Sequence, residues 1–186
     1  MRHLPAAALA LLLAACAAPA PSPTPPAAIG ACTINELVVE FRGWNGATGS
    51  LVGSIAFANR SSLPCTLEGT PRVRLLNASG RALPVDVRTL DVGRSTRTVV
   101  LAPGNARLPA PGVALRPGQA SLLLVWSNWC GEPPDLARIA IAPGGGSEFT
   151  VAATLHRIDG RLIAPRCDEP TVSSRLGVGS FEPAAP

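Results

Sequence analysis

The sequence contains no lysine and no tyrosine, so all 16 of its basic residues are arginine. Without lysine the chain cannot form a Schiff base, a serine–lysine dyad or the lysine-dependent phosphate-binding loop. Without tyrosine it lacks a further acid/base and nucleophilic group. These absences exclude several classes of enzyme before any motif is considered.

Histidine is nearly absent as well, with only two in the chain, His3 and His156. His156 has Asp159 three residues further on, but no Gly-x-Ser-x-Gly motif supplies a nucleophile. The spacing is more typical of a strand that ends in a turn. No Cys-x-x-Cys pair occurs and the 12 acids show no paired spacing, so the sequence predicts no metal site and no cofactor.

Clusters of charge of one sign are also missing, although the formal net charge is +4. The arginines are scattered among acidic residues, and Asp91 interrupts the densest group, Arg88, Arg94 and Arg97. Nucleic-acid binding requires a clustered basic stripe. The pattern indicates a solvated surface of mixed charge, and no nucleic-acid partner is predicted.

The N-terminus carries the features of an export signal. A positively charged start precedes an apolar run over residues 4–15, which is too short to span a bilayer. The run ends in Leu13-Ala14-Ala15-Cys16, which resembles the lipobox of bacterial lipoproteins, in which the cysteine is lipidated and the signal is cut before it. The alternative is an ordinary signal peptide with a chance cysteine.

A proline-rich stretch follows the lipobox and favours the lipoprotein interpretation. Residues 17–28 contain five prolines, and such a chain stays extended and holds a domain away from a surface. No later apolar run reaches 18 residues. We expect a signal at 1–15, a lipidated Cys16 with a tether to residue 30, and one domain over 31–186, lipid-anchored to the bacterial cell membrane and extracytoplasmic.

Four cysteines remain in the expected domain: Cys32, Cys65, Cys130 and Cys167. An even number in an exported domain indicates two disulfides. Three pairings are possible, and the sequence-local choice, Cys32–Cys65 with Cys130–Cys167, is preferred. Each bond would stabilise the fold by about 3–4 kcal/mol in the chain-entropy account.

The domain has the pattern of short β-strands, because apolar and polar residues alternate over residues 37–42, 51–58, 72–75 and 136–142. Residues 43–49 are predicted as a turn, and 84–88, 161–167 and 176–181 as edge strands. Glycine and proline punctuate the chain every eight to twelve residues. The predicted fold is all-β, a two-sheet antiparallel β-sandwich that is immunoglobulin-like and stapled by disulfides.

Two segments carry a family resemblance. Residues 59–71 read Asn-x-Ser-x-x-Pro-Cys-Thr-Leu-x-Gly-x-Pro, and residues 115–120 and 126–130 read Leu-Arg-Pro-Gly-Gln-Ala and Trp-Ser-Asn-Trp-Cys. Together with Cys32 they resemble the domain of unknown function 4232 family over residues 32–181. That resemblance implies an extracytoplasmic β-sandwich with disulfides, and it implies no catalytic or binding residue.

Trp44, Trp126 and Trp129 are the three tryptophans of the chain. Trp126 and Trp129 are predicted to belong to the core, whereas Trp44 lies beside Asn45-Gly46 and is a possible ligand contact, because exposed indoles stack on sugars or protein partners. We expect an envelope module, held at the membrane through Cys16, that binds a protein or a cell-wall polymer. The alternatives are an enzyme acting on envelope glycans through His156 or unpaired acids, and a purely structural lipoprotein.

Overall fold

The computed structural model describes residues 28–90, 98–144, 146–153, 155, 157–158 and 161–185. The predicted signal and most of the predicted tether, including Cys16, lie outside these residues, as do His156 and Asp159. Within them the chain forms strands and one short 3-10 helix, η1 (Ile34–Glu36). No helix of the described part is long and apolar enough to cross a membrane.

One layer of the molecule is a five-stranded sheet, ordered β1-β2-β7-β12-β5. Its strands are β1 (Leu37–Ala47), β2 (Ser50–Asn59), β7 (Ala120–Ser127), β12 (Arg175–Pro183) and β5 (Asp86–Thr89). The residues of β7 are alternately buried and half-buried, because successive side chains of a strand point to opposite faces of the sheet. The buried face carries Leu122, Leu124 and Trp126.

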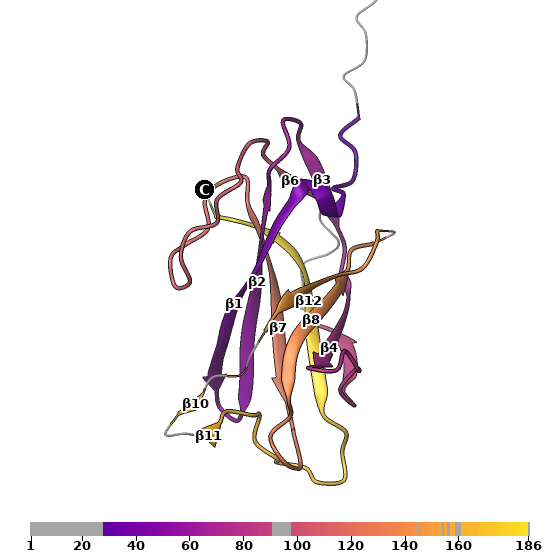
Figure 1. Cartoon of the computed structure of the whole chain (residues 1–186), viewed down its shortest axis with the longest axis vertical. Helices are drawn as coiled ribbons and strands as arrows, with labels where there is room; N and C mark the ends of the chain where they lie inside the picture. Colours follow the sequence, from indigo (N-terminus) through magenta and orange to yellow (C-terminus); the bar gives the residue numbers. More distant parts are fainter. Residues whose placement is uncertain are drawn as a thin grey trace, which may run out of the picture.

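The second layer consists of the sheet β4-β8-β9 and the strand pair β3-β6 (Figure 1). Its strands are β4 (Arg72–Asn77), β8 (Leu136–Ala142), β9 (Phe149–Ala152), β3 (Cys65–Glu68) and β6 (Thr98–Leu101), and a small hairpin joins β10 (Arg157–Ile158) to β11 (Arg161–Leu162). Apolar residues from both layers form one core, in which the Phe57 and Phe181 rings meet edge to face at 5.2 Å. The predicted all-β sandwich is therefore confirmed.

Three details of the predicted sheet were wrong: the position of β12, the wholly antiparallel pairing, and the turn at residues 43–49. Strand β12 is not an edge strand, because it lies between β7 and β5. Strand β5 pairs with β12 in parallel, so the sheet is not wholly antiparallel. The immunoglobulin-like relationship stays a prediction, since strand order alone does not test it.

The third error concerns residues 43–49, which were predicted as a turn. Strand β1 continues to Ala47, because a bulge between Phe41 and Trp44 absorbs one residue and Gly43 adopts a φ of 103° there. The hairpin instead turns at Thr48 and Gly49, with φ of 41° and 86°. Two successive positive φ values are typical of the two-residue turns that match strand twist.

Both disulfides form with the sequence-local pairing, Cys32–Cys65 and Cys130–Cys167. The first joins the N-terminal segment to β3, and the backbone amide of Cys32 also donates to Thr66 O at 2.9 Å. The second joins the connection that follows β7 to the segment that precedes β12. Paired disulfides of this kind indicate an oxidising, extracytoplasmic compartment.

The sandwich has two distinct ends (Figure 1). The N-terminal segment enters beside β3 and β6, and we call this the entry end. The β1–β2 hairpin, the 128–135 connection and the 163–174 segment lie at the opposite end, which we call the distal end. The two disulfides therefore fasten opposite ends of the molecule.

Candidate functional site

The longest irregular segment of the described chain runs from 102 to 119 and connects β6 to β7. Two backbone bonds hold its start against the β2–β3 connection: Gly104 N donates to Ser61 O at 2.7 Å, and Asn105 N to Asn59 O at 2.8 Å. Irregular loops of this length are uncommon in compact domains and are usually functional or disordered. This one is fixed by many contacts, which makes it a candidate functional loop.

Gln119 organises the base of the 102–119 loop from a fully buried position. Its Nε2 donates to Arg107 O at 2.8 Å and to Asn105 Oδ1 at 3.2 Å, while its Oε1 accepts from Arg116 N at 2.9 Å. A buried amide must satisfy its donors and acceptor to avoid a desolvation penalty. Because these partners come from the loop itself, the amide fixes the loop's path.

Arg42 holds the tip of the same loop. Its side chain extends from the bulge of β1, is only 9% exposed, and donates to the carbonyl oxygens of Pro109, Ala110 and Val113. Glu40 lies 3.7 Å away and supplies a weak ion pair. A guanidinium presents several donors in a fixed plane, so one side chain can bind three carbonyls.

The clamped loop covers part of the outer face of the five-stranded sheet and leaves a groove beside it. The outer face of β2 carries Ala56 and Ala58, which are fully buried although they point away from the core. The groove has a volume of about 1160 Å³. We call it the outer groove, and its lining comprises Arg42, Asn45, Ser54, Ile55, Ala56, Gly112, Val113, Ala114, Leu115, Pro117, Ser121, Glu182, Pro183, Ala184 and Ala185.

Polar groups from four neighbouring strands converge on the outer groove. They are Asn45 of β1, Ser54 of β2, Ser121 of β7 and Glu182 of β12, with Ser121 and Glu182 directly paired across the ladder. Val113, which is 58% exposed, adds an apolar wall. Hydroxyl, amide and carboxylate groups along an open groove can bind an extended polar ligand, and one carboxylate does not constitute the pair that glycoside hydrolysis requires.

A smaller pocket of about 510 Å³ opens near the entry end. Apolar groups of Ile34, Leu67 and Phe149 line it, together with the Cys32 end of the first disulfide and the carboxylate-bearing Glu68. Its size suits a small molecule. It has less than half the volume of the outer groove and is not bordered by the clamped loop, so we take the outer groove as the stronger candidate.

Trp44 does not occupy a position from which it can stack on a ligand. Its ring is 5% exposed and packs at 5.1 Å from Phe41 and 5.8 Å from Trp126. Gly53 lies opposite, where a Cβ would be 2.7 Å from Trp44 Cε3. The burial does not support Trp44 as a ligand contact, although its Nε1 is a buried donor without a hydrogen-bond partner in the described structure.

The other two tryptophans have the predicted core roles. Trp126 is fully buried and its Nε1 donates to Ser174 Oγ at 2.8 Å. Trp129 is half-buried against the core, meets Trp126 edge to face at 5.4 Å, and donates from Nε1 to Glu132 O at 2.7 Å. The two indoles pack against each other at the end of β7, where the chain leads into the second disulfide.

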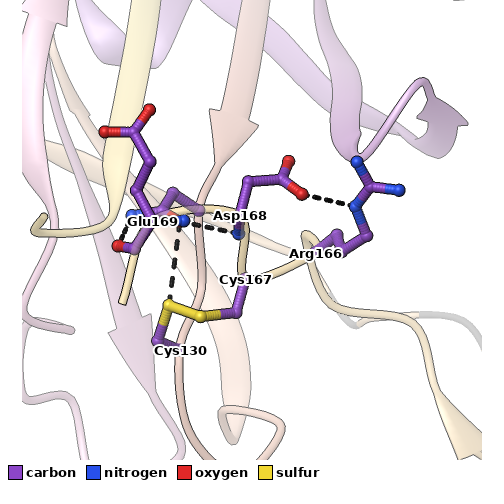
Figure 2. A network of polar contacts seen from close by, with 6 residues as sticks. Cys130, Arg166, Cys167, Asp168 and Glu169 are labelled. Atoms are coloured by element: carbon purple, nitrogen blue, oxygen red, sulfur yellow. Dashed lines mark hydrogen bonds and ion pairs between the residues drawn. A yellow bond between two sulfur atoms is a disulfide. The ribbon is translucent and has the colours of Figure 1, made fainter. Parts of the chain in front are cut away.

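Asn128 organises the distal end around the Cys130–Cys167 disulfide, beside which Figure 2 shows Arg166, Asp168 and Glu169. Its Oδ1 accepts from the backbone amides of Asp168 and Glu169 at 3.1 and 2.9 Å, and its Nδ2 donates to the carbonyls of Glu169 and Val172 at 2.9 and 2.7 Å. The exposed Arg166 and Asp168 form an ion pair beside it. These contacts are structural, because the amide's bonding capacity is used by the backbone.

The remaining predicted residues lie outside the described part of the chain. They are the lipidation residue Cys16 and the possible catalytic pair His156 and Asp159. Among the described residues, no group of three or more histidine, cysteine, aspartate or glutamate side chains is arranged to hold a metal ion.

Arg42, Gln119 and Glu182 were missed by the sequence analysis. A single arginine on an alternating strand is typical of a solvated face, and nothing local distinguishes Arg42 from Arg72 or Arg74. Gln119 had one usable signal, its place directly after the Pro117-Gly118 turn and before an apolar strand. Glu182 reaches the groove only because β12 pairs with β7, and the local sequence gives no sign of that pairing.

The fold and groove define an extracytoplasmic, disulfide-stapled β-sandwich with one clamped loop over its larger sheet. The family model described as Domain of unknown function (DUF4232) matches residues 32–182, so the chain belongs to that family and the resemblance is confirmed. Neither a curated protein nor a solved structure matches the chain.

Proposed function

We propose that the protein is a lipid-anchored, non-enzymatic binding module of the cell envelope, which holds an envelope protein or a cell-wall polymer in its outer groove. The observation that carries this proposal is the clamped 102–119 loop. Arg42 and Gln119 together make six side-chain hydrogen bonds, which fix the path of the loop and hold its tip to β1. A loop held so firmly keeps the groove preformed, and preformed sites bind with a smaller entropic cost.

The groove supports binding better than it supports a reaction. Its one guanidinium, that of Arg42, is engaged by loop carbonyls, and its one carboxylate is that of Glu182. The enzyme alternative depended on His156, which lies outside the described residues, and on unpaired acids, of which Glu182 alone is among the described lining residues and has no second carboxylate beside it there. The purely structural alternative does not account for an ordered groove lined by groups from four strands.

Membrane attachment through Cys16 forms the second part of the proposal, and it is supported by the lipobox and the proline-rich tether. Two or three acyl chains anchor a protein firmly, whereas one chain is marginal. The full chain expressed in a bacterium should appear in the membrane fraction and incorporate labelled fatty acid. Cys16→Ser should abolish both, and unchanged labelling in this variant would exclude Cys16 as the anchor.

The binding test is thermal unfolding of the mature, oxidised protein with peptidoglycan fragments, wall polysaccharide and solubilised envelope protein. A ligand at a hundred times its dissociation constant stabilises the fold by about 2.7 kcal/mol, which is several degrees for a domain of this size. Glu182→Gln keeps the shape of the side chain and removes the groove's carboxylate charge. We expect it to diminish the shift.

Glu148→Gln is the matched control, because Glu148 is an exposed carboxylate paired with Arg74 on the other sheet. It should leave the ligand-induced shift unchanged. A shift that Glu148→Gln reduces as much as Glu182→Gln would place binding elsewhere. No shift with any of the three samples would count against the binding function and favour the structural alternative.

A further inference from the structure

Exposed apolar side chains gather at the entry end of the molecule. Of the five exposed large apolar residues in the described chain, Ile29 (45%), Leu63 (70%) and Val100 (47%) lie on or beside the β3–β6 pair, whereas Val113 lines the outer groove and Val87 lies on β5. Leu63 lies in the connection between β2 and β3, and Val100 of β6 pairs with Thr66 of β3. We call these three residues the entry face.

The chain's path fixes the entry face relative to the N-terminal segment. Ala31 bridges Thr66 in parallel, Thr66 N donates to Gly30 O at 2.9 Å, and the Cys32–Cys65 disulfide closes the join. The segment therefore runs alongside β3 as a short added strand. An attachment of the chain before Gly30 therefore also keeps the entry face close to the point of attachment.

Two loops at the entry end are basic and two distal connections are acidic; the acids Glu68 and Glu148, which also lie toward the entry end, are engaged by Thr98 and Arg74. At the entry end, residues 59–64 and 102–119 contain Arg60, Arg107 and Arg116 and no acidic residue. At the distal end, residues 128–135 and 163–174 contain four acids and one arginine; the acids are Glu132, Asp135, Asp168 and Glu169. The acid of η1, Glu36, has its carboxylate occupied by Thr33.

We propose that the entry face docks on an anionic lipid bilayer, with the Leu63 side chain inserted among the headgroups and the three arginines over them. This inference rests on the lipid anchor of the proposed function. A lipid surface is the partner, because the chain that leaves the entry face continues to Cys16. Exposed apolar tips flanked by arginine suit the bilayer interface, and anionic lipids attract basic residues near them.

Anchoring alone does not enforce this contact. The link from Cys16 to Ala28 reaches no more than about 40 Å when fully extended, so it permits both a raised and a docked domain. Docking selects one orientation, with the acidic distal end directed away from the membrane. The outer groove then stands along the side of an upright sandwich, where an envelope polymer can reach it.

The test uses the mature lipidated chain in vesicles of phosphatidylcholine and phosphatidylglycerol whose acyl chains carry bromine, a short-range quencher of indole fluorescence. Leu63→Trp places an indole at the proposed insertion point. Only backbone groups of Leu63 are engaged: its carbonyl accepts from Asn59 Nδ2 and Ser61 Oγ, and its amide donates to Ser61 Oγ, so the exposed side chain can be replaced. The matched control is Val87→Trp, which is also exposed but lies on β5, paired with the start of β12.

We expect brominated lipid to quench at least half of the emission added by Leu63→Trp, and to leave the Val87→Trp emission at the level of the wild-type background. Equal quenching of both, or of neither, would overturn the docking. In vesicles of phosphatidylcholine alone the quenching of Leu63→Trp should fall; an unchanged value would overturn the role given to the arginines.

The wild-type chain is also floated with the vesicles, which tests the anchor separately from docking. Failure to float would overturn the anchor, and docking with it. Flotation without quenching would overturn docking alone.

Discussion

Asn128 combines an unusual backbone conformation with a full set of side-chain bonds. Its φ is 55°, in the left-handed region that favours glycine, and asparagine tolerates that region better than other side chains. The side chain is nearly buried and holds the 168–172 backbone through four hydrogen bonds. Two substitutions at this one residue can therefore separate the effect of backbone strain from the effect of the lost hydrogen bonds.

We predict that Asn128→Ala lowers the free energy of unfolding by about 2 kcal/mol, because backbone groups lose partners and alanine is strained at positive φ. Asn128→Gly loses the same bonds without the strain, so it should be about 1 kcal/mol more stable than the alanine variant. Denaturant unfolding with both disulfides intact measures the two values. Equal stabilities would contradict the strain, and a loss near zero in both variants would contradict the bonding role.

Glu36 is the described acid whose titration the structure clearly alters. The backbone amide and then the hydroxyl of Thr33 donate to its carboxylate, at 2.7 and 2.8 Å, and hold the pKa of Glu36 below its ordinary value of 4.5, against a small opposing effect of desolvation. A depressed folded pKa stabilises the fold fully above the unfolded value. That contribution is lost as the pH falls through the folded pKa.

We therefore predict that Glu36→Gln and the wild type differ in stability above pH 4.5 and converge as the pH falls below it. Side-chain carbon NMR should give a titration midpoint for Glu36 under 4.5. A midpoint at or above 4.5, or a stability difference that persists at the acidic end of the range, would show that Thr33 does not hold the carboxylate in solution.

At the scale of the strand, two bulges decide which side chains enter the core. The four residues of β1 from Phe41 to Trp44 oppose three of β2, so Trp44 points inward, where strict alternation would place it on the outer face. A similar irregularity in β12 separates Val178 from Phe181 and brings Phe181 into the core. Alternation predicted most strand faces, but a bulge depends on pairing with a neighbour and leaves little local signal.

The same dependence on distant partners concealed the outer groove. Strand β2 and the 102–119 loop are far apart in sequence, and they border one groove because Arg42 and Gln119 fix the path of the loop. Cysteine count and strand period therefore predicted the staples and the fold class. The order of the strands and the groove required long-range pairing that the sequence pattern does not encode.

We predict that Arg42→Met, which keeps the aliphatic stem, releases the loop tip and leaves the sheet intact. Hydrogen exchange of the amides in residues 108–114 should accelerate about tenfold or more, since local opening no longer breaks three charge-assisted bonds. Core amides of β2 and β7 should keep their protection. Arg74→Met, at an exposed ion pair on the other sheet, is the control and should alter neither region. Unchanged exchange at 108–114 would contradict the clamp.

At the scale of the whole molecule, the two disulfides fasten opposite ends in different surroundings. In the Cys32–Cys65 disulfide, Cys65 is only 3% exposed. In the other disulfide, Cys130 and Cys167 are both exposed. Thiol–disulfide exchange begins with attack of a thiolate on a sulfur atom, so access to the bond governs which one opens first. The end that faces away from the chain's entry is thus the more reducible end.

We predict that glutathione acting on the native protein opens Cys130–Cys167 at least tenfold faster than Cys32–Cys65. One thiolate forms a mixed disulfide with Cys130 or Cys167, and a second releases the free cysteine pair and oxidised glutathione. Timed alkylation with mass spectrometry identifies which cysteines become free. Because Asn128 still holds the 168–172 backbone, reduction should accelerate hydrogen exchange in the distal connections while the core keeps its protection. Simultaneous labelling of all four cysteines would instead mean that opening of the distal disulfide unfolds the whole sandwich.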